Sequence, residues 1–313
     1  ITKQKNDHPN NLVTFLSSGS IAYLQTIFSN NKIFDKFIEI KTINCELEGV
    51  SKHKNQSIIF NDKKNDILGK IVMNSFFEEY LDKEIEKYKN IWCSETSGIE
   101  KTSNLKHKIL LKLEDGTEIY SKVFALSSTK NQKIIDNLNI KFIKQDFMQD
   151  ALSVSVDVDL KKNETAFQKF TTDGSIALLP YFKNEASIVW SIKRNSQLLK
   201  LDQKELESEL FMQLNDFVNE MKIKDINTHS LNFRYAKNLV DQHTVLIGNI
   251  AHNIHPVAGQ GLNLSIKDIA LLVKTLLKYQ SLGYLINDPI VLQEFNQKRK
   301  LDNHGLLIWN SNS

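Results

Sequence analysis

The hydrophobic and polar positions in the last third of the chain fall into three successive patterns. Thr244–Ile247 is a short uncharged run, and Gly248 and Asn249 interrupt it. A segment with a proline and two glycines follows. Beyond it, apolar residues recur three or four positions apart, as on one face of a helix, at Ile266, Ile269, Ala270, Val273 and Leu277. These patterns predict a strand over 245–247, a loop over 252–260 and a helix from Leu264 to about Tyr279.

The middle of the chain predicts a sheet and a long helix. Apolar and polar residues alternate through 153–160, as in a strand with one buried face. The runs 175–182 and 186–192 flank three polar residues and predict a hairpin, so residues 151–192 should form an antiparallel sheet. A helix is expected over 202–221, with Asp202 and Glu205 as its capping pair. Its buried stripe would be Leu206, Leu210, Leu214, Phe217 and Met221.

The first half of the chain carries weaker signals of the same kinds. The small residues 17–20 predict a helix cap with a helix over 21–28 behind it. A strand within 40–50 should pair with 57–60, and a strand at 71–73 should lead into a helix over 75–88. Asp115 and Gly116 predict a two-residue hairpin turn, and 123–126 reads as a further strand.

Composition narrows the class of protein. The chain has 313 residues, 41% of them hydrophobic and 25% charged, which is typical of a globular protein. A net charge of +3 gives no reason to expect nucleic-acid binding. The two cysteines lack metal-ligand spacing and suit a reducing cytoplasm, and no apolar run is long enough to span a bilayer. His252 and His255 lie in a Pro/Gly loop, so loop polarity explains them better than zinc does, and no metal site is expected.

The loop before the last predicted helix has the chemistry of a ligand site. Gly259 and Gly261 would let a ligand approach the backbone without meeting a Cβ atom. The helix start behind them offers free N–H groups and the positive end of the helix dipole. An electron-rich or anionic group would therefore fit against Gly261, Leu262 and Asn263. Asn249 follows a strand, where open α/β sheets place ligand-binding side chains. The plainer alternative is an ordinary strand–loop–helix with two turn glycines.

The stretch GNIAHNIHPVAGQGLNLSIKD, residues 248–268, resembles the second flavin motif of the FAD-dependent aromatic hydroxylases, the p-hydroxybenzoate hydroxylase-like superfamily. The match is closest to the ubiquinone-biosynthesis branch, the 2-polyprenyl-6-methoxyphenol hydroxylases. A second stretch agrees, with Ala166-Phe167, Phe170, the run 174–180 and Ile188-Val189-Trp190. The resemblance extends from about Ser17 to Asp302 and is strongest after Ala151.

The resemblance implies an α/β (α+β) fold with two domains. The first is a Rossmann-like FAD-binding domain over 1–40, 68–148 and 240–313, incomplete because the first βαβ unit with its Gly-x-Gly-x-x-Gly is missing. The second is an antiparallel-sheet substrate domain over 41–67 and 149–239. The implied activity is an FAD-dependent monooxygenase that uses NAD(P)H and O₂ to hydroxylate a prenylated phenol in ubiquinone biosynthesis. The protein would be cytoplasmic, with possible peripheral contact at the inner membrane and with other ubiquinone-biosynthesis proteins.

The resemblance also assigns residues. It puts His255 and Pro256 at the flavin face, with no acid–base residue assigned. The cofactor-binding set is Gly248, Asn249, Pro256, Gly259, Gln260, Gly261, Leu262 and Asn263. Leu179 and Pro180 are candidates for an apolar substrate wall, as is Trp190, for which sheet-core packing is the preferred interpretation. Arg299 and Asp302 match an R-x-x-D of the family and are expected to form a surface or partly buried ion pair.

Three departures from the family pattern keep a second interpretation open. Leu12 stands where the family has an arginine near the flavin, Leu126-Ser127 replaces an Asp-Gly, and the glycine fingerprint is absent. The alternative is a flavin-free or degenerate paralogue that acts as a scaffold in the ubiquinone biosynthetic complex. A flavin reductase acting on prenyl chains is a third possibility. For the enzyme, we expect this chain alone to bind FAD weakly and to be inactive, because the pyrophosphate half of the site is missing.

Overall fold

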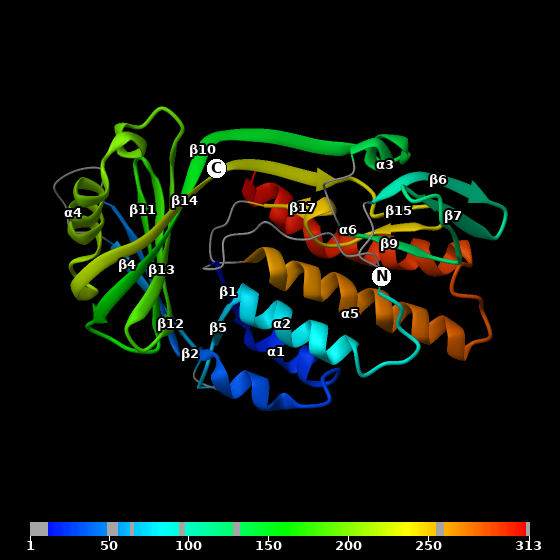
Figure 1. Cartoon of the computed structure of the whole chain (residues 1–313), viewed down its shortest axis with the longest axis horizontal. Coiled ribbons are helices and arrows are strands. Elements are labelled where there is room, and N and C mark those ends of the chain that lie inside the picture. The colour runs from blue at the N-terminus through cyan, green and yellow to red at the C-terminus, as the bar shows by residue number, and fades with distance from the viewer. Residues whose placement is uncertain are drawn as a thin grey trace.

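Two long strands connect the two halves of the molecule. The computed structural model describes residues 12–48, 56–62, 66–93, 98–127, 132–254 and 260–310. Strands β10 (Phe142–Leu160) and β14 (Val218–Ala236), 19 residues each, pair antiparallel and run along the top of Figure 1 from one half to the other. One half is mainly sheet, and the other holds most of the helices (Figure 1).

The larger sheet has eight strands and contains both long strands. Its order is β17-β14-β10-β13-β12-β11-β3-β4. All neighbours are antiparallel except β11 and β3. The antiparallel sheet expected over 151–192 is thereby confirmed. The remaining strands are β17 (His252–Asn253), β13 (Glu185–Lys193), β12 (Gly174–Phe182), β11 (Thr165–Thr171), β3 (Thr42–Leu47) and β4 (Gln56–Asn61).

Helix α4 (Gln203–Leu214) covers one face of this sheet. The Asp202 side chain accepts from the backbone N–H of Glu205, and Glu205 accepts from the backbone N–H of Asp202, so the predicted capping box is confirmed. The helix is shorter than the expected 202–221. Asn215 caps it, and β14 begins at Val218 because pairing with β10 satisfies the backbone from there on. Phe217 therefore stacks on Phe167 outside the helix, and Met221 lies in β14.

A three-stranded sheet and two helices form the start of the chain. Its order is β1-β5-β2, with β1 (Val13–Ser17), β5 (Gly69–Met73) and β2 (Ile38–Ile40). Ser17 caps α1 (Ser18–Gln25), which begins and ends three residues before the predicted 21–28 because the cap is the first of the small residues. Helix α2 (Asn74–Ile85) similarly precedes the predicted 75–88, and a short 3₁₀ helix, η1 (Asn31–Lys36), lies between the two.

Two further sheets and the last helices complete the described chain. β15 (Val240–Asp241), β16 (Thr244–Leu246) and β9 (Phe124–Leu126) form one sheet, with β16 and β9 parallel. The other comprises β6 (Ile99–Leu105), β7 (Lys108–Leu113) and β8 (Glu118–Ser121). The helical elements are α3 (Gln132–Asn137), η2 (Gln197–Lys200), η3 (Gly248–Ile250), α5 (Gln260–Ser281) and α6 (Pro289–Asn310).

The β7–β8 turn is longer than predicted. Gly116 donates its N–H to Leu113 O (3.0 Å) and has φ +86°, so three residues, Glu114 to Gly116, make the turn instead of two. The glycine takes the left-handed position of a bulged hairpin loop.

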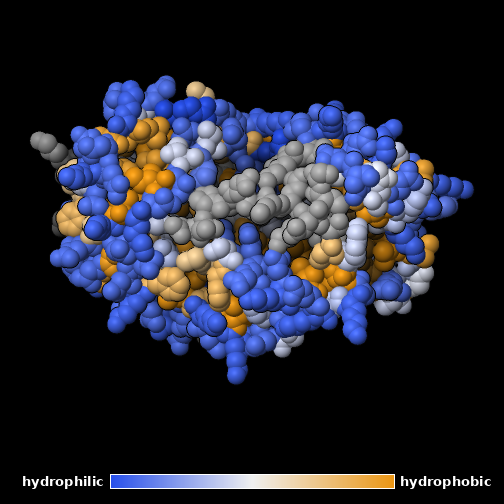
Figure 2. Space-filling view, viewed as in Figure 1, coloured by the Kyte–Doolittle hydropathy of each residue, from blue (hydrophilic) through white to orange (hydrophobic). Residues whose placement is uncertain are grey.

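The buried face of α5 is not the apolar face that the sequence suggested. Ile266 is buried, but Ile269, Val273 and Leu277 are exposed, Leu277 to 59%. The buried face consists of Leu264, Asp268, Leu272, Thr275 and Tyr279, which follow the same helical spacing with two polar members. Figure 2 shows apolar surface over the part of the face where α5 runs.

The mixed α/β fold with an antiparallel sheet agrees with the expected fold class. The division into an FAD-binding and a substrate domain stays a prediction. Strand β10 spans its proposed boundary at 148/149, and β14 ends at Ala236, before the boundary at 239/240. Within the described residues, no helix has the length and apolar character needed to cross a membrane.

Gly174 tests the sheet packing. A Cβ on Gly174 would lie 1.8 Å from Ser191 O, and its φ is +148°. We expect Gly174→Ala to lower the free energy of unfolding by at least ~2 kcal/mol, because a backbone atom cannot yield cheaply. In the control Gly19→Ala, the new Cβ meets nothing within 4 Å and α1 should gain ~0.5–1 kcal/mol. Urea unfolding measures both, and equal stability of the two variants would contradict this packing.

Candidate functional site around the start of α5

Strand β16 is followed, two residues after its end, by a glycine with a left-handed backbone. Gly248 has φ +72°, and a Cβ built on it would lie 3.6 Å from Ser265 Oγ and 3.9 Å from Ser127 Cβ. Ile247 follows the strand with extended backbone and donates its N–H to Leu126 O (3.0 Å), so the predicted strand is shifted by one residue. Asn249 comes next and is exposed, at the carboxyl end of the strand as expected.

Helix α5 begins four residues before the predicted start at Leu264. Ser265 Oγ donates to Gly261 O (3.0 Å), a contact one helical turn back, and the turn from Gln260 to Asn263 is already helical. The predicted loop thus ends before Gln260. Among the described residues, a Cβ on Gly261 would meet nothing within 4 Å, so the backbone of this first turn is open toward them on that side. First-turn N–H groups have no partner within their own helix and can bind an electron-rich ligand.

The Asn263 side chain fixes this first turn to the start of the chain. Its Oδ1 accepts from Ser17 N (2.9 Å) and Ser20 Oγ (2.7 Å), and its Nδ2 donates to Phe15 O (2.6 Å). Leu262 packs beside it against the apolar cluster around Leu16. The side chains of both residues are therefore occupied by packing and hydrogen bonds within the protein. A cofactor role for Leu262 and Asn263 stays a prediction.

A buried carboxylate holds the other side of α5. Asp268 is fully buried, and its Oδ2 lies 2.5 Å from His252 Nε2, which donates because a carboxylate can only accept. Its Oδ1 accepts from Arg299 Nε (2.6 Å), and Arg299 is 2% exposed. Arg299 Nη1 donates to Asp302 Oδ2 (3.2 Å), which is exposed. These contacts join β17, α5 and α6 at one point.

The expected ion pair of Arg299 and Asp302 exists, but its main partner is different. Asp302 lies at the surface, while Asp268 receives the shorter hydrogen bond inside the protein. The sequence offered one signal for this: Asp268 is a charged residue among the apolar repeats of α5. Buried charges are stable only when paired, so a partner had to exist.

Several predicted residues lie outside the described part of the chain. His255, Pro256 and Gly259 belong to the segment 255–259, and the Gln260 side chain is likewise outside the description. Their predicted contact with a flavin stays a prediction. The described neighbours on both sides, Asn253 in β17 and Gly261 in α5, set where this segment starts and ends.

The proposed substrate residues lie where the two halves of the molecule meet. Leu179, whose side chain is 9% exposed, belongs to an apolar cluster with Ile71 of β5 and Tyr181. Pro180 is also buried. Trp190 belongs to the core under α4, which confirms the packing interpretation given for it. Burial and a hydrogen bond to Glu185 (2.9 Å) raise the pKa of Tyr181 to about 12, so this phenol stays neutral at physiological pH.

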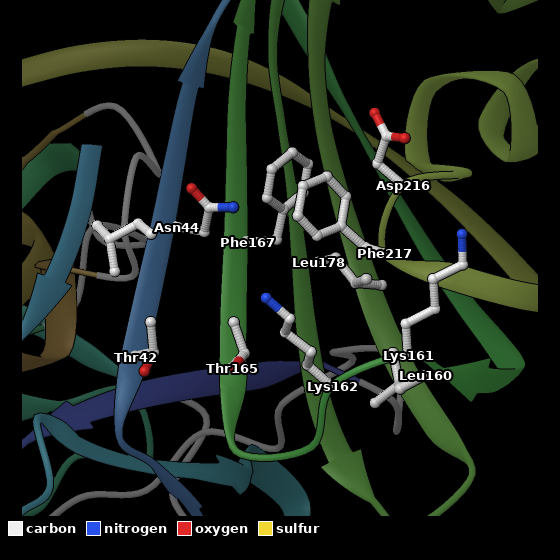
Figure 3. A pocket seen from close by; sticks show the side chains of 11 residues that line it. Thr42, Asn44, Leu160, Lys161, Lys162, Thr165, Phe167, Leu178, Asp216 and Phe217 are labelled. Carbon is white, nitrogen blue, oxygen red and sulfur yellow. The ribbon is translucent and has the colours of Figure 1, made fainter. Parts of the chain in front are cut away.

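A cavity of about 290 Å³ lies on the face of the large sheet opposite to the one where Leu179 packs against β5. Figure 3 shows Asn44 and Thr165 on neighbouring strands with the stacked rings of Phe167 and Phe217 beside them. Phe167 packs with the α4 core, whereas Leu179 packs against β5, so this cavity is separated from the start of α5 by the sheet itself. Among the described residues, no group of His, Cys, Asp and Glu could hold a metal ion.

Comparison with known proteins agrees with the resemblance seen in the sequence. Residues 132–281 match the family described as FAD binding domain. The 3-demethoxyubiquinol 3-hydroxylase of Escherichia coli is 26% identical over 239 residues, which are 76% of this chain and 61% of that protein. The mitochondrial ubiquinone biosynthesis monooxygenase of Caenorhabditis elegans is 27% identical over 281 residues, covering 76% of this chain and 62% of that protein. The chain thus spans about three fifths of the length of these relatives. The expected resemblance to FAD-dependent hydroxylases of ubiquinone biosynthesis is confirmed.

Solved structures share the fold. The probable FAD-dependent monooxygenase pqsL of Pseudomonas aeruginosa superposes with a TM-score of 0.77 at 15% identity, covering 99% of this chain and 87% of that one. HpxO of Klebsiella pneumoniae, solved with FAD and uric acid, gives a TM-score of 0.71 at 11% identity, with 99% and 79% covered. At these identities the likeness concerns the fold alone.

The Asp268 anchor can be tested by removing its charge. We expect Asp268→Asn to lower the free energy of unfolding by ~3–5 kcal/mol, because Arg299 would lose its buried counter-charge and keep only the exposed Asp302. The control Asp302→Asn removes the exposed partner of the same arginine and should cost less than ~1 kcal/mol. Urea unfolding of both variants gives the comparison. Similar losses in the two would mean that the buried pair does not carry the stability assigned to it.

Proposed function

We propose that this chain, whose residues 132–281 match the FAD binding domain family, is the catalytic part of an FAD-dependent monooxygenase that hydroxylates a prenylated phenol in ubiquinone biosynthesis. The observation that carries the proposal is the open first turn of α5. Gly261 is open there toward the described residues, the helix behind it is fixed on both sides by Asn263 and Asp268, and exposed Asn249 follows β16.

The residues present fit the isoalloxazine half of FAD. A planar ring can approach a backbone that lacks a Cβ, and Gly261 provides that approach. The N–H groups and helix dipole of the first turn of α5 favour electron-rich oxygen and nitrogen atoms. Asn249 has an exposed amide that can donate and accept hydrogen bonds to a polyhydroxyl chain. When bound, FAD supplies the reducing equivalents, taken from NAD(P)H, and the activation of O₂.

The protein's own part is binding and positioning. Asp268 and His252 fix the end of β17, from which the chain enters segment 255–259, and Asn263 fixes the point at which α5 begins. We assign no proton transfer to any residue. Leu179 and Pro180 are proposed as the wall that an apolar substrate meets, because they lie between the large sheet and β5.

The substrate class sets the proposed location. The two relatives are named as a 3-demethoxyubiquinol 3-hydroxylase and a ubiquinone biosynthesis monooxygenase, and a prenyl tail partitions into lipid. We therefore propose a cytoplasmic protein that works in peripheral contact with the inner membrane and beside other enzymes of the pathway.

The direct test is hydroxylation. Because this chain alone is expected to bind FAD weakly, the test uses a protein that contains this chain together with a complete FAD site. It is given FAD, NADPH, O₂ and a short-tailed prenylphenol, and the product is weighed by mass spectrometry. A gain of one oxygen atom supports the enzyme. A protein of that kind that binds no flavin yet copurifies with pathway enzymes would support the scaffold interpretation instead.

Gly261 is the position that should respond most to the cofactor. We expect Gly261→Val to fold normally, because its Cβ meets no atom of the described residues. It should lose flavin affinity at least ~10-fold, because the side chain would occupy the space of the ring. Flavin titration, followed by absorbance, and circular dichroism measure the two properties.

The matched control is Ala270→Val, which adds the same side chain to the same helix away from its first turn. Its flavin affinity should equal that of the unchanged protein. A Gly261→Val protein that binds flavin as well as this control would show that the first turn of α5 does not approach the cofactor.

A further inference from the structure

A second cavity, of about 520 Å³ and with mostly polar lining residues, opens on one face of the paired strands β10 and β14, which we call the β10–β14 arm. Lys144 of β10 is the register partner of Arg234 of β14, and Arg234 is in turn the partner of Asn253 of β17. Register partners project to the same face of a sheet, so these side chains form one row across three strands. Asp146 and Asn232, the next partners along the arm on that face, form a second row.

The first row places two positive charges side by side. Like charges directly opposite each other destabilise a strand pair unless an anion lies between or beside them. Among the described residues, neither Lys144 nor Arg234 contacts a carboxylate. Arg234 is half-buried, and its guanidinium lies 5.5 Å from the centroid of the Phe142 ring, which fixes its position without neutralising its charge.

The one carboxylate of the cavity lining is already paired. Both oxygens of Asp146 accept from Arg194, at 2.8 Å from Nη1 and 2.9 Å from Nη2, a bidentate pair. The amide side chains on this face are those of Asn232 and Asn253, and Asn253 Nδ2 already donates to Asn232 O (2.8 Å). The cavity therefore offers two unneutralised cations with the Asn232 amide beside them, a combination suited to the oxygens of a phosphate group.

From this arrangement we propose that the cavity binds the phosphate group of a phosphorylated small molecule. Its volume exceeds that needed by an ion and falls within the range of small-molecule sites. Lys144 and Arg234 hold the phosphate oxygens, and the Asn232 amide binds the remainder of the molecule.

Two sources can supply that phosphate group. One is the nicotinamide dinucleotide reductant, and this identification rests on the proposed function. The other is free inorganic pyrophosphate. Calorimetry of the full chain with NADPH, with inorganic pyrophosphate and with phosphate-free nicotinamide riboside separates them. We expect at least one phosphorylated probe to bind and the riboside not to bind. Displacement of pyrophosphate by NADPH identifies the reductant as the ligand. If pyrophosphate binds and NADPH does not displace it, the cavity is an anion site that is independent of the reductant. Both outcomes can be observed even if the hydroxylation test of the proposed function fails.

The variants are Lys144→Glu and Arg234→Glu, each expected to weaken binding of the phosphorylated probe at least tenfold, and affinity should fall as salt is added. Lys183→Glu, in the exposed β12–β13 turn, makes the same charge change elsewhere and should leave affinity within twofold. If Arg234→Glu fails to fold by circular dichroism, the exposed Lys144→Glu decides alone. The proposal is wrong if no phosphorylated probe binds, if riboside binds equally well, or if Lys183→Glu weakens binding as much as Lys144→Glu.

Discussion

The arrangement of the helical half of the molecule depends on one carboxylate that has no access to water. Asp268 accepts from His252 on one oxygen and from Arg299 on the other, so β17, α5 and α6 meet at a buried charge that needs partners. Apolar packing tolerates small slides of a helix, but a buried ion pair with short hydrogen bonds does not. The rotation of α5 about its axis is thereby fixed, and with it the direction in which its first turn faces.

This anchoring separates stability from ligand contact along a single helix. The groups that hold α5 are side chains, Asn263 toward β1 and α1 and Asp268 toward β17 and α6. The groups proposed to meet the cofactor are backbone atoms around Gly261, where no side chain of the described residues intervenes. A helix start that is rigid before a ligand arrives loses little entropy on binding, which is how preorganised sites gain affinity.

The sequence could predict features in which neighbouring residues decide the outcome. The hairpin around 183–185 and the Asp202–Glu205 capping box were predicted correctly because alternation and a three-residue spacing are local properties. The end of α4 was missed because Phe217 and Met221 continue the helical spacing by chance while the backbone pairs with β10. The partnership of Asp268 and the opposition of Lys144 and Arg234 join residues that only the fold brings together. No pattern along the chain contains that information.

The hydrogen bonds between Asn263 and the beginning of the described chain affect the order in which the protein can fold during its synthesis. Ser17, the partner of Asn263, leaves the ribosome 246 residues earlier, so β1 and α1 must wait for most of the protein before their last hydrogen bonds can form. Contacts of such large sequence separation slow folding, because a long loop must close before they stabilise anything. The large sheet, whose central hairpins are local, can assemble first. Most of the apolar cluster around Leu16 comes from the same early part of the chain, whereas Leu262 and Ile266 come from α5. The side of the cluster that these two cover therefore stays uncovered until α5 has been made.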